Sequence, residues 1–347
     1  AGVLLQADEQ GTLTLSAFDY EISATVTVEA EVSEGGEVLV LGRLLADISR
    51  NLPNKPVEVA TDGTKVQLVC GSSRFSLIQM PVGDYPSLPT SSESSGSVPG
   101  DVFTNAVSQV SIAADRGDTL PILTGVRVEI EGEKMTLLAT DRYRLAMREL
   151  TWTPQDPGVS HVALIPARTL SETAKALGAA GSIEVALGDA ARGEGLIGFE
   201  AGSRRATTRL LDGEYPKVTS IFPSSVDTVA VVDTHTILEA VRRVALVAER
   251  NTPVRLRFSQ GQVAIEAGTG DDAQGSEAIE ASLTGPELEI AFNPQFLLDG
   301  LSALGTAFAR ISFTQPSKPA VLSGQAEMDG DSDESYRYVL MPVRFAG

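Results

Sequence analysis

The stretch VALIPARTLSETAKALGAAG, residues 162–181, runs from a hydrophobic β-type segment through Pro166 into a segment with apolar residues at helical spacing. The same strand-to-helix pattern recurs twice, in VLVLGRLLADISRNLPNKP (38–56) and in LEIAFNPQFLLDGLSALGTA (288–307). In each copy the strand leads into a glycine or a proline, and an amphipathic segment follows. The recurrence predicts a chain built from three copies of one unit.

Two further correspondences support a repeat of about 125 residues. RFSLIQMPVGDYPSLP (74–89) matches RATTRLLDGEYPKVTSIFP (205–223) around an acidic residue followed by Tyr-Pro. GVLLQADEQGTLTLSAFDYEISA (2–24) matches GVRVEIEGEKMTLLATDRYRLAM (125–147). The tail RYVLMPVR (337–344) occupies the place of the first pair in the third unit. We therefore expect the tail to be a buried last strand that also lines a binding surface.

Alternation of apolar and polar residues dominates between the helical segments and predicts half-buried antiparallel sheet. Polar stretches at 90–100 and 223–228 predict the boundaries between units. The expected fold is α+β, with two helices and about eight strands per unit. The predicted domains are 1–97, 98–224 and 225–347.

The second and third units each open with a further helical segment, at 100–115 and 235–250. The first unit has no counterpart before Gly2. By this comparison we expect roughly 25 to 30 residues, including one helix, to be missing at the front.

Composition excludes several classes of protein. No stretch approaches 18 continuous apolar residues, so no membrane span is expected. The single cysteine, Cys70, lies in a strand-like run and is expected to be a small buried core residue rather than a reactive thiol. One cysteine cannot form an intramolecular disulfide, which fits a reducing compartment and a cytoplasmic location.

Residues for catalysis are scarce. The two histidines, His161 and His235, lie in unrelated places, and no nucleophile, base and orienting group can be assembled around either. A G-x-G-x-x-G pattern at 193–198 is followed by a strand-and-turn pattern, so it predicts a hairpin and no dinucleotide site. DGDSDE (329–334) has calcium-loop spacing but lacks the turn glycine, and Leu340 stands where the closing Glu belongs. We expect no enzyme activity, no metal and no cofactor.

The formal net charge of −19 argues against binding a polyanion unless the charge is unevenly placed. The helical segments together are nearly neutral, so the negative charge lies on strands and on loops, including the acidic stretches 269–277 and 326–335, which are expected to be solvated. The helices therefore form a surface much less negative than the rest. They either present solvated faces or offer cations to phosphates.

Three stretches together resemble a known family: ATDRYRLAMREL (139–150), FNPQFLLDGL (292–301) and YRYVLMPVR (336–344). They look like the bacterial DNA polymerase III beta subunit, the sliding clamp, of the high-GC Gram-positive (actinobacterial) type. The resemblance covers essentially the whole chain. It implies three similar clamp domains, each with two helices packed on antiparallel sheets, and a head-to-tail homodimer that closes into a ring around double-stranded DNA. It also implies no catalysis and contact with DNA that is independent of base sequence.

The resemblance further implies two sets of site residues, for peptides and for the dimer interface, and the cations of the helical segments predict a third set, for DNA. The replicative DNA polymerase and the clamp loader would bind by short peptides to a cleft between the second and third domains, formed by Leu123, Thr140, Arg142, Tyr143, Arg144, Leu145, Pro216, Ile221, Asn293, Phe296, Met341, Pro342, Val343 and Arg344. DNA would face Arg43, Arg50, Arg168, Lys175 and Arg242. The dimer interface would include Arg74, Phe75, Leu246 and Val247, the last two on the helix 235–250.

The chemistry of the implied peptide site is plausible, because its apolar residues form an adaptable floor and Arg144, Arg344 and Asn293 can bond a peptide backbone or acidic groups. Arg142 stands where some relatives have a small residue, and Tyr143 where the enterobacterial clamp has His. Both residues would change the rim of the implied peptide pocket. Two alternatives stay open: a clamp paralogue or scaffold that binds peptides or an inhibitor without DNA, and a hydrolase on a β-rich fold. Retention on circular DNA separates the first alternative from the clamp.

Overall fold

The computed structural model describes residues 2–89, 93–117, 119–188, 195–249, 252–268 and 273–344. The chain divides into two compact units. The first comprises residues 1–101, 152–157 and 172–210, and the second comprises residues 102–151, 158–171 and 211–347. Helices α2 (Gly100–Ser111) and α3 (Ala167–Leu177) each contain a boundary between the units.

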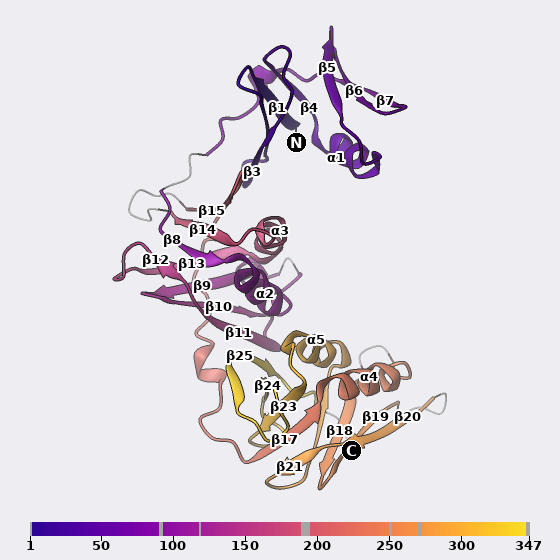
Figure 1. The fold of residues 1–347 in the computed structure, drawn as a ribbon. Helices are drawn as coiled ribbons and strands as arrows, with labels where there is room; N and C mark the ends of the chain where they lie inside the picture. Colours follow the sequence, from indigo (N-terminus) through magenta and orange to yellow (C-terminus); the bar gives the residue numbers. More distant parts are fainter. Residues whose placement is uncertain are drawn as a thin grey trace. The chain divides into compact units, whose positions relative to one another are not determined.

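A nine-stranded antiparallel sheet forms most of the first unit, in the order β12-β8-β14-β15-β16-β3-β2-β1-β4 (Figure 1). A second sheet has the order β5-β6-β7. The strands are β1 (Gly2–Asp8), β2 (Thr12–Phe18), β3 (Ile22–Glu29), β4 (Gly36–Leu41), β5 (Glu58–Asp62), β6 (Lys65–Cys70), β7 (Ser73–Ile78), β8 (Gly96–Pro99), β12 (Thr153–Pro154), β14 (Ser182–Leu187), β15 (Leu196–Ala201) and β16 (Arg204–Arg209).

The helix of this unit, α1 (Gly42–Asn51), follows β4 directly, as its sequence pattern predicts. Its Leu45 is buried in a cluster with side chains of both sheets, while Leu44 stays 45 % exposed. Cys70 at the end of β6 is 1 % exposed, and its thiol donates to the carbonyl of Pro53 at 3.4 Å. The prediction of a small core cysteine is confirmed.

The second unit contains another nine-stranded sheet, in the order β13-β9-β10-β11-β25-β24-β23-β17-β21, and a four-stranded sheet in the order β20-β19-β18-β22. Helices α4 (Thr234–Ala245) and α5 (Pro294–Leu304) lie side by side in it (Figure 1). The strands are β9 (Gly125–Glu131), β10 (Lys134–Thr140), β11 (Arg144–Thr151), β13 (Ser160–Pro166), β17 (Thr228–Asp233), β18 (Val254–Ser259), β19 (Gln262–Ala267), β20 (Gly275–Glu280), β21 (Ser282–Thr284), β22 (Leu288–Phe292), β23 (Phe308–Phe313), β24 (Ala320–Gln325) and β25 (Ser332–Leu340).

Both large sheets combine strands from neighbouring predicted domains. Strand β16 of the second predicted domain pairs with β3 of the first, and β25 of the third pairs with β11 of the second. The second predicted domain therefore contributes to both compact units. Its strand β16 joins the sheet that contains the first predicted domain, and its strand β11 joins the sheet that contains the third. The residue boundaries of the three domains stay predictions.

The helical segments appear where the sequence predicts them, but two end early: α2 ends at Ser111 and not near residue 115, and α4 ends before residue 250. Helix α4 ends at Ala245, so Leu246 and Val247 do not lie on a helix as expected. The amides of both residues bond to carbonyls three residues back, at 3.2 and 3.3 Å, which tightens the chain into a final turn.

The acidic stretches are more ordered than expected. Part of 269–277 belongs to β20, where Glu277 pairs with Arg243 at 2.7 Å, and residues 269–272 lie outside the described residues. Part of 326–335 belongs to β25. Acidic side chains are compatible with these strands because they point to water or to a cation. The tail is shorter as a strand than predicted, since β25 ends at Leu340.

The G-x-G-x-x-G stretch runs into β15, which pairs with β16 in a hairpin, and no helix begins within its described residues 195–198. Gly193 lies outside the described residues. His235 is exposed near the start of α4, and His161 is partly buried in β13, where burial lowers its pKa. Among the helices that the structure describes, none is long and apolar enough to cross a membrane.

Candidate functional site

A tight turn of three residues, Asp141 to Tyr143, joins β10 to β11. The carboxylate of Asp141 accepts the backbone N–H groups of Tyr143 and Arg144, both at 3.0 Å. The hydroxyl of Thr140 donates to the carbonyl of Arg144 at 2.6 Å. Arg142 adopts a left-handed backbone with φ of 79°, which costs energy for a residue with a side chain. The turn is therefore held in one shape, and it leaves Arg142 and Tyr143 exposed.

Arg144 lies beneath this turn and is only 5 % exposed. Its guanidinium donates to Asp141 at 2.9 Å and to Asp299 of α5 at 2.6 Å, and it stacks over the ring of Phe296 at 4.2 Å. Burial works against its charge, but Tyr338 and the two carboxylates outweigh burial and hold the pKa above its usual range. The Nε and Nη1 of Arg144 already donate to these carboxylates, and a contact of Arg144 with a peptide stays a prediction. Arg144 fixes the turn to α5.

Helix α5 and strand β25 pack against each other beside Arg144. Gly300 on α5 leaves room for the ring of Tyr338, which would lie 2.4 Å from any Cβ at that position. The hydroxyl of Tyr338 donates to the carbonyl of Phe296 at 2.8 Å. Asn293 caps α5 by accepting the N–H of Phe296 at 3.1 Å, so its side-chain oxygen is used by the helix rather than offered to a peptide.

The tail after β25 is fastened by two backbone hydrogen bonds. The N–H of Met341 donates to the carbonyl of Tyr143 at 2.9 Å, and the N–H of Val343 donates to the carbonyl of Ala291 at 2.8 Å. Residues 341–343 are partly exposed and Arg344 is exposed. The prediction of a buried last strand is confirmed for Tyr338, Val339 and Leu340, whereas the next four residues are not buried, and their part in a binding surface stays a prediction.

An apolar cluster lies on the same part of the second unit. Four of its neighbours, Ile122, Leu211, Ile221 and Phe222, are only partly buried and pack against it. Its buried members are Leu123, Leu138, Leu145, Met147, Leu164, Tyr215, Val218, Val321 and Val339. Leu123 and Leu145 are thus core residues at 3 % and 1 % exposure, and a peptide would meet the partly exposed neighbours first. Burial also raises the pKa of Tyr215 to about 12, so this hydroxyl stays neutral.

Most of the predicted peptide-site residues are connected in the structure. Residues 140–145 contact Phe296 through Arg144, and they contact the tail through the hydrogen bond from Met341 to Tyr143. Pro216 is exposed beside the buried Tyr215 and joins them only through its neighbour. Sequence reasoning missed Asp141, Asp299 and Tyr338, which hold Arg144, although all three stand inside the quoted motifs. It also missed Phe222 and Arg337, whose guanidinium lies 4.4 Å over the Phe222 ring.

The other predicted sites remain separate patches. All five cations predicted to face DNA are exposed, and two have neighbours on their own helix: Arg50 pairs with Asp47 at 3.2 Å and Arg242 with Glu239 at 2.6 Å. Exposed pairs of this kind are weak enough to exchange for a phosphate. Of the predicted interface residues, Phe75 is 38 % exposed and Leu246 is 83 % exposed. Both side chains are therefore accessible to a partner chain.

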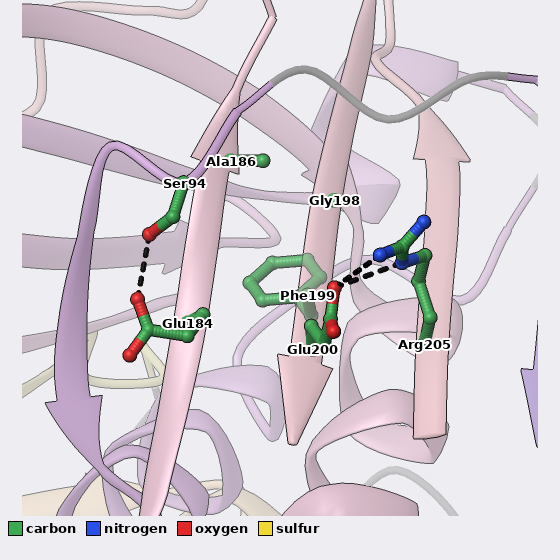
Figure 2. Close-up of a pocket in the computed structure, with 7 residues that line it drawn as sticks. All are labelled: Ser94, Glu184, Ala186, Gly198, Phe199, Glu200 and Arg205. Atoms are coloured by element: carbon green, nitrogen blue, oxygen red, sulfur yellow. Dashed lines mark hydrogen bonds and ion pairs between the residues drawn. The ribbon is translucent and has the colours of Figure 1, made fainter. Parts of the chain in front are cut away.

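A small hollow lies on the large sheet of the first unit (Figure 2). Glu184 accepts the hydroxyl of Ser94 at 2.6 Å, and Glu200 accepts the guanidinium of Arg205 at 2.6 Å. Its volume of about 30 Å³ is the size of one water molecule. It is too small for a peptide or a nucleotide.

Comparisons with known proteins match the whole chain. The family models of the DNA polymerase III beta subunit match consecutive stretches: the N-terminal domain 1–89, the central domain 97–217 and the C-terminal domain 219–344. The beta sliding clamp of Streptomyces coelicolor is 58 % identical over 347 residues, which is 100 % of this chain and 92 % of the relative. The beta sliding clamp homolog GriR of Streptomyces muensis is 46 % identical, over 99 % of this chain and 91 % of its own.

Solved structures are similar as well. The sliding clamp of Pseudomonas aeruginosa bound to griselimycin is 27 % identical with a TM-score of 0.87, covering 99 % of this chain and 91 % of its own. The sliding clamp of Bacillus subtilis is 28 % identical with the same TM-score and the same coverage.

Proposed function

The chain belongs to the family of bacterial DNA polymerase III beta subunits, the sliding clamps, and we propose that the surface formed by its 140–145 turn, its apolar cluster and its tail binds partner peptides. The protein is a DNA sliding clamp, a non-catalytic processivity subunit of DNA replication. It keeps a polymerase on DNA as a tether, so affinity for a particular base sequence is unnecessary.

One observation carries the peptide proposal. The tail is bonded through Met341 and Val343 to Tyr143 and Ala291, so its partly exposed side chains are held in place beside a rigid turn. Preorganised apolar anchors reduce the entropy lost on binding. The partners fitting this surface are short apolar peptide segments of the replicative polymerase and the clamp loader.

The assembly that follows is a homodimer that closes into a ring around double-stranded DNA in the cytoplasm. Phe75 with Arg74 on one chain would meet Leu246 and Val247 on the other, a head-to-tail contact that closes. The helices would face the DNA through Arg43, Arg50, Arg168, Lys175 and Arg242. The exposed Leu246 and the exposed helix cations support this assignment.

A clamp paralogue or scaffold that binds peptides or an inhibitor without DNA remains the second candidate, because the beta sliding clamp homolog GriR is 46 % identical and the P. aeruginosa clamp is bound to griselimycin. The identity of 58 % to the S. coelicolor clamp favours the replicative clamp. Loading by a clamp loader onto nicked circular DNA decides between them. A replicative clamp is retained on the circle and released when the circle is cut, whereas a scaffold that does not bind DNA is never retained.

The peptide site is tested by calorimetry with a Gln-x-x-Leu-Phe peptide. Micromolar affinity corresponds to about −8 kcal/mol. Met341→Ala removes apolar contact area and should cost about 1–3 kcal/mol. Deletion of residues 341–347 should abolish binding while sedimentation still finds the dimer, since the proposed interface lies elsewhere. Peptide binding that survives the deletion, or a dimer that dissociates, would contradict the assignment.

A further inference from the structure

Arg337 on β25 lies on the face of the sheet that carries the apolar cluster. It stands opposite Met147 of β11, and Val339, two residues along the same strand, is a buried cluster member. Directly opposed and alternate residues of a sheet share a face. The guanidinium lies 4.4 Å over the ring of Phe222, and its Nη2 approaches the Met147 sulfur at 3.8 Å. The cation of Arg337 therefore lies beside the apolar cluster, on the same face of the sheet.

This cation has an unused donor. The Nε of Arg337 is buried and has no hydrogen-bond partner, and its side chain is only partly exposed. Within the described residues, no ion pair joins Arg337 to a carboxylate, whereas its neighbour Arg148 lies 3.6 Å from Asp333. An orphan buried donor on a cation is costly, and it is satisfied best by a charged acceptor.

The internal repeat supplies a matched arginine. In the first compact unit, the backbone N–H of Arg209 donates to the carbonyl of Glu21 at 2.9 Å. The backbone N–H of Met341 donates to the carbonyl of Tyr143 in the same way. Counting back four residues along each last strand places Arg205 where Arg337 stands. Arg205 is neutralised by Glu200, which lies opposite it on β15, at 2.9 and 2.6 Å (Figure 2).

The third predicted domain, which contains Arg337, has no counterpart of Glu200 at this register position. On β24 the position that would continue the register opposite Arg337 is Ser323, and the register shifts there between Leu322 and Gly324. The Ser323 hydroxyl is hydrogen-bonded to that of Ser332 at 2.7 Å. The register position that Glu200 occupies opposite Arg205 is therefore occupied opposite Arg337 by Ser323, whose hydroxyl is already hydrogen-bonded.

We propose that Arg337 is a specificity-determining residue of the peptide site, which recognises a carboxylate of the bound partner beside its apolar anchors. The inference rests on the proposed peptide-binding function. The carboxylate comes either from an Asp or Glu side chain or from a peptide C-terminus, and both offer the same charge-assisted acceptor. Phe222 covers one face of the guanidinium and Nε is buried, so the acid approaches the part of the guanidinium edge that is exposed.

The experiment uses the full-length dimer and Gln-x-x-Leu-Phe peptides that carry Glu at each non-anchor position in turn. Every Glu peptide has a Gln partner of the same length, and a free C-terminus is compared with an amidated one. At one position, or at the free C-terminus, the acidic peptide should bind about 5- to 30-fold more tightly than its neutral partner. That preference should shrink as salt rises, because charges are screened.

Arg337→Gln should remove the preference while the neutral peptides bind as before. Arg205→Gln is the matched control, and it should leave the preference unchanged because Arg205 already has its own glutamate. Equal affinity of acidic and neutral peptides for the unmodified protein overturns the proposal without any variant, so a folding defect in Arg337→Gln does not protect it. A preference that survives in a folded Arg337→Gln protein overturns it too. Failure of every peptide to bind refutes the peptide site itself.

Discussion

Arg144 shows how a single buried cation organises the surface that we propose binds peptides. It is held by Asp141 from its own turn and by Asp299 from α5, so it joins two elements that are far apart in the sequence. A buried ion pair stabilises little compared with apolar packing, but breaking one side is costly because a charge stays buried without a partner. At the residue scale, the site therefore depends on a cation that need not touch a peptide.

Replacing Arg144 with Met should lower the free energy of unfolding by about 3–5 kcal/mol, since two carboxylates lose their cation. Urea unfolding followed by circular dichroism measures the loss. Arg242→Met is the control, because its pair with Glu239 is exposed and should contribute less than about 1 kcal/mol. Equal losses in the two variants would show that the Arg144 pairs do not organise the site.

Asp233 should make α4 sensitive to acid. Its carboxylate accepts the hydroxyl and the N–H of Thr236 at 2.6 and 2.7 Å, which lowers its pKa. A lowered pKa in the folded state stabilises the fold above the unfolded-state pKa, and the gain is lost as pH falls through the folded-state value. Asp233→Ala should cost about 0.5–2 kcal/mol at pH 7 and progressively less below about pH 4. Urea titrations across this range test it, and a constant difference would exclude the carboxylate as the cause.

At the scale of elements, one turn appears twice with different surroundings. Asp19 accepts the N–H groups of Glu21 and Ile22, as Asp141 does in its own turn, and Tyr20 matches the left-handed Arg142 with φ of 73°. Around the first copy, however, Ser23 pairs with Thr207 in the register positions that Leu145 and Val339 occupy around the second. The repeat keeps the turn, while the paired side chains beside it are polar in the first copy and apolar in the second.

The final turn of α4 should hold the dimer together. Changing both Leu246 and Val247 to Asp should yield monomers by sedimentation, because each buried side chain contributes about 1.5–3 kcal/mol. Val162→Asp is the matched control, since Val162 is also an exposed apolar residue but lies on β13. A dimer that persists in the double variant places the interface elsewhere.

Across the whole molecule, the negative charge is partitioned away from the helices. The five described helices carry six cationic and five acidic side chains, although the chain has a net charge of −19. Local sign governs the attraction of phosphates, and a negative exterior limits non-specific binding. A tether that slides needs both properties.

Reversing the helix cations to Glu should shorten the residence of the loaded clamp on circular DNA without separating the dimer. Each lost phosphate contact should also reduce the slope of log affinity against log salt by roughly 0.9. The set is Arg43, Arg50, Arg168, Lys175 and Arg242. Reversal of Arg205 and Arg257, which are exposed on strands, is the control. Unchanged residence of the helix variant would mean that these residues do not face DNA.

The sequence by itself determined the three-fold repeat, the strand-to-helix transitions, the buried Cys70 and the position of the tail in the third unit. These depend on local spacing and on which residues avoid water, both of which can be seen along the chain. Only the tertiary structure decided that α4 stops at Ala245, that Arg144 is already paired and that Arg337 lacks the acid given to Arg205. Those outcomes depend on residues brought together by strand pairing and helix packing. A side chain's partners over 150 positions away, such as Asp299 for Arg144, leave no periodic signal in the sequence.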